Sequence, residues 1–161
     1  ALLGSFSSFG IMGYMEVGDA FSDYGFSKED LAMNLLGCAT GFLLYRYPDI
    51  GKKLDFRMEY IPRFSNSDLV TDYEHMKFLM AVKPAGFKSL QKSALRPFEF
   101  HLGYYARGYP HQADKERNIY LGIGISLPYL FSTQSMKKTA RVLNYYQLPY
   151  TYISYDRDLN R

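Results

Sequence analysis

The sequence predicts an α+β fold in which small-residue N-terminal helices pack on an antiparallel meander of four or five strands, with a C-terminal helix. Three observations predict it: apolar residues recur at helical spacing before residue 48, alternate with other residues between 54 and 127, and return to helical spacing after 132. We expect a single domain over 1–161, with a helical part at 1–48, a sheet at 54–127, and a helix and tail at 132–161.

Composition limits the classes of function. The 19 basic and 16 acidic residues are nearly balanced and scattered along the chain, which argues against nucleic-acid binding. The 16 Tyr and 12 Phe favour either a β-rich domain or a membrane-interface location, and both alternatives stay open. No uninterrupted apolar stretch has the length of about 18 residues that a spanning helix needs.

The first predicted helix runs from about Ser7 to Asp19. The stretch from Ala1 to Val17 has no charge before Glu16 and carries neither an initiator Met nor a basic leader region, so it does not have the pattern of a signal peptide. Gly4, Gly10 and Gly13 would let another helix approach closely. We therefore expect the chain to be a fragment that begins mid-domain.

The second predicted helix, from Lys28 to Tyr45, has clear capping chemistry. Ser27 is placed as the N-cap, and Asp30 lies three residues later in a capping-box-like position. Pro48 marks the end of the helical pattern.

Four segments alternate with a period of two and predict strands at 54–60, 76–83, 98–107 and 118–127. In the first of them Asp55, Arg57 and Glu59 alternate with apolar residues, which predicts a strand whose polar face is wet. Gly122 and Gly124 lie within a strand, where glycine allows close packing or strong curvature. A third helix is predicted from Ser132 or Thr133 to about Gln147, and the tail 150–161 reads as an edge strand or a docking arm.

The apolar face of this sheet must be covered. Three alternatives are the N-terminal helices, lipid and a partner chain. Aliphatic residues on one face with Gly and Tyr on the other resemble outer-membrane barrel strands, but four strands cannot close a barrel. We favour the helices as the cover.

The segment Gly25–Phe42, GFSKEDLAMNLLGCATGF, preceded by Glu16 and Asp19, resembles the hallmark segment of the YfiM-like predicted periplasmic lipoprotein family. Members of that family usually carry an Asp-Lys-x-x-His helix upstream, and nothing here matches it. The resemblance implies a cell-envelope location, on the periplasmic side of the bacterial outer membrane or embedded in it. It implies no established activity.

Four side chains are candidate catalytic residues: Glu16, Asp19, Asp30 and Asn34. They share helix faces in pairs, so two packed helices would bring their oxygens together to position a general base or hold a hard cation. Capping and interhelix hydrogen bonds explain the same residues without catalysis, and we favour that interpretation. No catalytic, cofactor or metal site is therefore assigned.

Cysteine and histidine add no site. Leu35–Cys38 fits a lipoprotein cleavage site only by accident, because charged residues occupy the place of the apolar region that must precede it. His75, His101 and His111 lie far apart, without the spacing of zinc ligands.

The leading functional hypothesis is a non-enzymatic accessory or structural subunit of a Gram-negative outer-membrane-associated assembly, with a larger envelope protein as partner and contact with lipid. One alternative is an envelope hydrolase or lipid-binding enzyme that uses the acidic cluster. A second alternative is part of an outer-membrane β-barrel.

Overall fold

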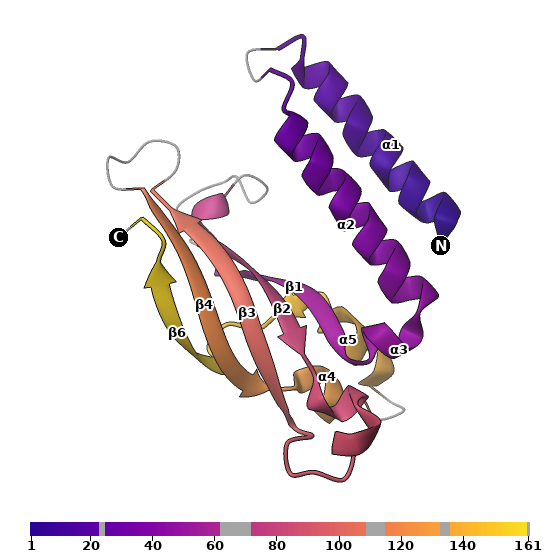
Figure 1. Ribbon diagram of the computed structural model, residues 1–161, viewed down its shortest axis with the longest axis vertical. Coiled ribbons are helices and arrows are strands. Elements are labelled where there is room, and N and C mark those ends of the chain that lie inside the picture. Colours follow the sequence, from indigo (N-terminus) through magenta and orange to yellow (C-terminus); the bar gives the residue numbers. More distant parts are fainter. Residues whose placement is uncertain (23–24, 62–71, 109–114, 133–135, 161) are drawn as a thin grey trace. The chain divides into compact units, whose positions relative to one another are not determined.

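The computed structural model describes residues 1–161 except 23–24, 62–71, 109–114, 133–135 and 161 (Figure 1). The chain divides into two compact units, Ala1–Gly51 and Lys52–Arg161, and each is described by itself. Predictions that join the two units, namely a single domain and helices packed on the sheet, stay predictions. Residues 65–67 and 109–111, which lie in connections between the predicted strands, are outside the described residues.

The first unit is a helical hairpin of α1 (Leu2–Asp19) and α2 (Lys28–Arg46), followed by the single turn α3 (Pro48–Gly51). The second helix has the predicted bounds to within one residue, and its N-cap is confirmed because the Ser27 side chain accepts from the Asp30 backbone N–H at 3.1 Å. The first helix begins earlier than predicted, at Leu2. None of the described residues of these three helices is buried.

The second unit is built on a six-stranded sheet with the order β5-β1-β2-β3-β4-β6. Its strands are β1 (Leu54–Tyr60), β2 (Met76–Val82), β3 (Phe98–Arg107), β4 (Glu116–Ile125), β5 (Tyr146–Gln147) and β6 (Tyr152–Asp158). The predicted meander is confirmed for the first four strands, which pair antiparallel in succession. The tail also forms the edge strand β6, which lies antiparallel to β4.

The strand count and the purely antiparallel pairing need correction. Among the described residues the sheet has six strands, and β5 pairs parallel with β1. β5 is only two residues long and lies inside the segment predicted as the end of the third helix, so no period of two marks it. A backbone hydrogen bond of 3.0 Å from Met58 to the carbonyl of Tyr145 holds this segment beside β1.

Short helical turns connect the strands: η1 (Tyr73–His75), η2 (Pro84–Gly86), η3 (Lys88–Leu90), α4 (Leu127–Leu130) and α5 (Lys137–Val142). The predicted C-terminal helix over 132–147 is thus shorter, with six described residues in α5. Of its two predicted start positions, Ser132 is not helical and Thr133 lies outside the described residues.

The buried face of the sheet is the polar one. Asp55, Arg57 and Glu59 of β1 are 5%, 4% and 2% exposed, whereas Phe56 between them is 47% exposed. The expectation that these three charged residues face water is wrong. Alternation defines two faces of a strand but does not say which of them the rest of the fold covers.

Glycines on the polar face let aromatic rings lie against the backbone. A Cβ at Gly103 would lie 2.2 Å from the ring of Tyr120, and one at Gly124 would lie 2.8 Å from the Cβ of Tyr152. The expectation that Gly124 permits close packing is confirmed. Only residues 148–151 separate β5 from β6, the two edge strands, so the sheet curves until one short connection links its edges.

Candidate functional site: a buried polar network behind an apolar sheet face

Arg57 of β1 is the centre of a buried network. Its Nη1 donates to Glu99 Oε1 at 2.6 Å and to Gln147 Oε1 at 2.8 Å. Its Nη2 donates to Asp55 Oδ2 at 2.8 Å and to Glu99 Oε2 at 3.0 Å. One guanidinium group therefore connects side chains from β1, β3 and β5, using the fork geometry that suits carboxylates.

Further polar side chains extend the network at both ends. Lys83 Nζ donates to Asp55 Oδ1 at 2.6 Å, and His101 Nε2 lies 2.9 Å from Glu99 Oε1. The carboxylates of Asp55 and Glu99 thus pair with the basic side chains of Arg57 and Lys83. This pairing makes burial of the ions tolerable, since an unpaired ion in the same place would be strongly unfavourable.

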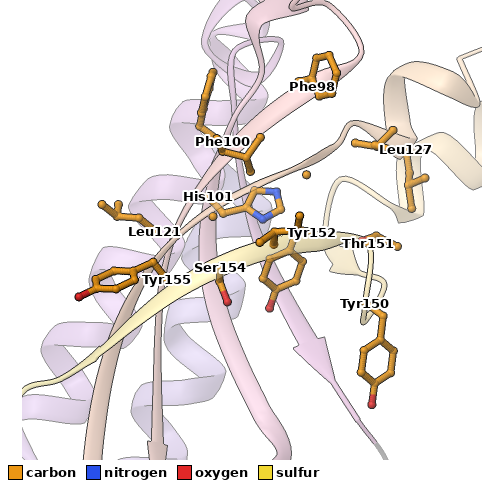
Figure 2. A pocket seen from close by; sticks show the side chains of 15 residues that line it. Phe98, Phe100, His101, Leu121, Leu127, Tyr150, Thr151, Tyr152, Ser154 and Tyr155 are labelled. Atoms are coloured by element: carbon orange, nitrogen blue, oxygen red, sulfur yellow. The ribbon is translucent and has the colours of Figure 1, made fainter.

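Aromatic rings line the polar face beside this network. The rings of Tyr120 and Tyr152 are stacked at 5.7 Å. Tyr152 also meets His101 edge-on at 5.0 Å (Figure 2). Lys77 Nζ lies 4.9 Å from the ring centroid of Tyr105 and 5.5 Å from that of Tyr120. The face is therefore filled by hydrogen-bonding and cation–π contacts, with only a small apolar cluster of Leu79, Ala81 and Tyr120.

The opposite face of the sheet is apolar and exposed. Register places its side chains in rows that cross the strands, and the central row joins Phe56, Met80, Leu102, Leu121 and Tyr155. Large residues of this face remain open, such as Leu121 at 64% and Ile153 at 84% exposed. We call these side chains the apolar face: Phe56, Phe78, Met80, Phe98, Phe100, Leu102, Tyr104, Ile119, Leu121, Ile123, Ile125, Ile153 and Tyr155.

A shallow hollow of about 1080 Å³ lies on part of the apolar face. Figure 2 shows Phe98, Phe100, Leu121 and Tyr155 around it, from β3, β4 and β6. Residues of the polar face, namely His101, Gly122, Gly124 and Tyr152, also contribute to its lining. This surface suits a hydrocarbon ligand or partner.

The predicted candidate residues lie in the helical hairpin. Glu16 and Asp19 of α1 and Asn34 of α2 are half-buried, whereas Asp30 is exposed at the N-terminal turn of α2. Asn34 lines a groove between the two helices with small residues such as Gly37 and Gly41. Within the described part of the chain, no three acidic, histidine or cysteine side chains come close enough to hold a metal ion. A catalytic role of Glu16, Asp19, Asp30 and Asn34 stays a prediction.

Cysteine and histidine take different places. Cys38 lies in the middle of α2 as a half-buried free thiol. His75 pairs with Asp72 at 2.6 Å, His101 belongs to the buried network, and His111 lies outside the described residues.

Sequence reasoning missed the network itself. Arg57, Glu99 and Gln147 are far apart in the chain, and alternation alone predicts that Arg57 lies on a wet strand face. A signal was present: oppositely charged residues occur on strands of one meander, at positions that register brings to the same face.

Comparison with known proteins gives one match. The model of a family described as "Predicted periplasmic lipoprotein (DUF2279)" matches residues 1–46, which comprise α1 and α2. No curated protein and no solved structure matches the chain.

Among the described residues, no helix is both long and apolar enough to cross a membrane.

Proposed function

Residues 1–46 carry the family segment of the predicted periplasmic lipoproteins, and on this premise we propose that the chain is a non-enzymatic structural component of the bacterial outer membrane. In this proposal the sheet unit forms part of a β-barrel wall, with lipid on its apolar face and the Arg57 network inside. The family description supports an envelope location. The observation that carries the rest is the inverted burial of β1 to β4.

In this unit polar side chains are buried and apolar ones are exposed, which is the reverse of the pattern in a domain surrounded by water. Among the described residues, ten buried side chains are polar or charged, and the buried hydrophobic ones are Met76, Leu79, Ala81, Tyr120 and Leu143, besides Pro84 and Pro128. A contiguous apolar surface over five strands is costly in water, while scattered apolar residues are ordinary. Hydrocarbon reverses the preference, so lipid outside and polar contacts inside satisfy both faces.

Strand length agrees with this proposal. β3 and β4 have ten residues each, and a strand that crosses a bilayer at a tilt needs about 9–11 residues. Alternation runs over the whole of β4, where Ile119, Leu121, Ile123 and Ile125 are exposed and the residues between them are buried.

The open edge of β6 is the reason why we propose a larger assembly. β6 pairs with β4 alone among the described strands, and its other edge presents backbone groups. In hydrocarbon such groups need partners, so the wall requires further strands beside β6. We propose that a neighbouring envelope protein or another part of a longer chain supplies them.

Tryptophan fluorescence tests the lipid contact directly. The chain has no Trp, so one introduced Trp reports a single position. We expect vesicles with acyl-chain-brominated phosphatidylcholine to quench L121W and Y155W on the apolar face strongly. The matched control Y105W, on the polar face, should be quenched little.

The quenching pattern shows whether lipid or something else contacts the apolar face. Equal and weak quenching at all three positions in vesicle-bound protein would overturn the proposal. Recovery of the whole chain in the aqueous fraction, with none bound to vesicles, would overturn it as well.

A further inference from the structure

The fold brings two distant connections to the same end of the sheet. β2 and β4 both lie antiparallel to β3, so they run in the same direction and their last residues lie at the same end of the sheet. The connection after β2 contains η2 and η3, and the one after β4 contains α4 and α5. Figure 1 shows α4 beside the turns that follow β2, and a backbone hydrogen bond of 2.7 Å from Ser126 to Pro97 joins the two connections.

These connections carry charge of a single sign. We define the basic cap as the described residues 84–97, 127–132 and 136–142, a sequence without Asp or Glu. Its cations are all exposed: Lys88, Lys92, Arg96, Lys137, Lys138 and Arg141. The other end of the sheet is mixed, because Arg117 and Arg157 lie near Glu116, Asp156 and Asp158.

The basic cap begins where the apolar face ends. Phe98 directly follows its first segment, and Ile125 lies just before its second. Exposed apolar side chains continue into the cap at Leu95 and Leu130. A hydrocarbon-facing surface therefore passes within a few residues into a surface of exposed cations.

We infer that the basic cap lies at the phosphate level of a leaflet that contains anionic lipids and binds their headgroups. The inference rests on the proposed function, because the apolar face must already be in lipid. Its charge complements phosphate, and its position next to the apolar face places the cations at the depth of the headgroups. The mixed charge of the opposite end gives no such attraction, so the sheet acquires a preferred orientation.

Vesicle flotation tests this inference with the full chain. Vesicles of phosphatidylcholine alone are compared with vesicles that also contain phosphatidylglycerol, at low and high salt. We expect tighter binding to the anionic vesicles, with a preference that salt weakens. In the double variants K88Q/K92Q and K137Q/K138Q, the ratio of binding to anionic over neutral vesicles should fall by about five-fold for each charge removed.

A matched pair at the other end of the sheet is the control. K115Q/R157Q removes the same formal charge and should keep most of the preference. Equal binding of the unmodified chain to both vesicle types, or an equal loss in the control, would overturn the inference. Binding of a soluble polyanion such as heparin without vesicles, as tight as vesicle binding, would also overturn it.

Failure here is distinguishable from failure of the proposed function. If brominated lipid quenches L121W but the anionic preference is missing, only the headgroup inference is wrong. If L121W is not quenched in vesicle-bound protein, the lipid-facing sheet itself is wrong.

Discussion

Arg57 and Glu99 form a two-point ion pair between strands that are not neighbours. The distances are 2.6 and 3.0 Å, and β2 lies between the two strands. Ala81, at the register position between Asp55 and His101, leaves room for the long side chains to cross. Their side chains are 1% and 0% exposed, so this pair is part of the interior.

Removing one partner of this pair should destabilise the sheet strongly. We expect E99Q or R57L to lower the free energy of unfolding by about 3–5 kcal/mol, since each removes the two-point counter-ion of the other residue and leaves a net charge in the buried network. The double variant R57L/E99L should lose less than either single variant. Urea unfolding of vesicle-bound protein, followed by circular dichroism, measures this, with E29Q on the exposed first turn of α2 as the control. A loss of equal size in E29Q would contradict the prediction.

Gly103 should not tolerate a methyl group. Its Cβ would lie 2.2 Å from the Tyr120 ring, so G103A should cost about 1–3 kcal/mol through overpacking. Shortening the opposite side chain in G103A/Y120V should recover part of that loss. G37A in α2 is the matched control, because nothing lies within 4 Å of the added atom. Thermal unfolding measures all three, and an unchanged midpoint in G103A would show that the contact is wrong.

A charge on the apolar face should cost free energy according to its depth. L121K, in the central row, should lower the free energy of unfolding in vesicles by about 2–4 kcal/mol, whereas I125K, next to the basic cap, should cost about 0–1. Reversible urea unfolding in vesicles measures the difference. Equal and small costs at both positions would indicate that water covers this face.

The helical hairpin depends on its cap. S27A removes the acceptor for the Asp30 amide and should cost about 1 kcal/mol of local stability. Hydrogen exchange at the first turn of α2 should therefore become faster. S7A, at an exposed position of α1, is the control and should leave exchange in α2 unchanged. Equal exchange rates in S27A and the unmodified chain would show that the Ser27 cap does not stabilise the first turn of α2.

Local features were predictable because neighbouring residues determine them. Ser27 and Pro48 set the bounds of α2, and a period of two set the bounds of β1 and β3. β5 was missed because two residues carry no period, and its place depends on a backbone contact with β1. The candidate site was missed for a related reason, since the Arg57 network joins strands through contacts distant in the chain.

The sequence by itself determined the helix cap, the four-strand meander and the two chemically different faces of its strands. The tertiary structure alone decided that the charged face is buried, that Arg57 and Glu99 meet across β2, and that scattered cations gather in one basic cap. The physical reason is that alternation and capping are local, whereas burial depends on how the sheet curves. That curvature comes from register, glycine positions and a short connection between edge strands.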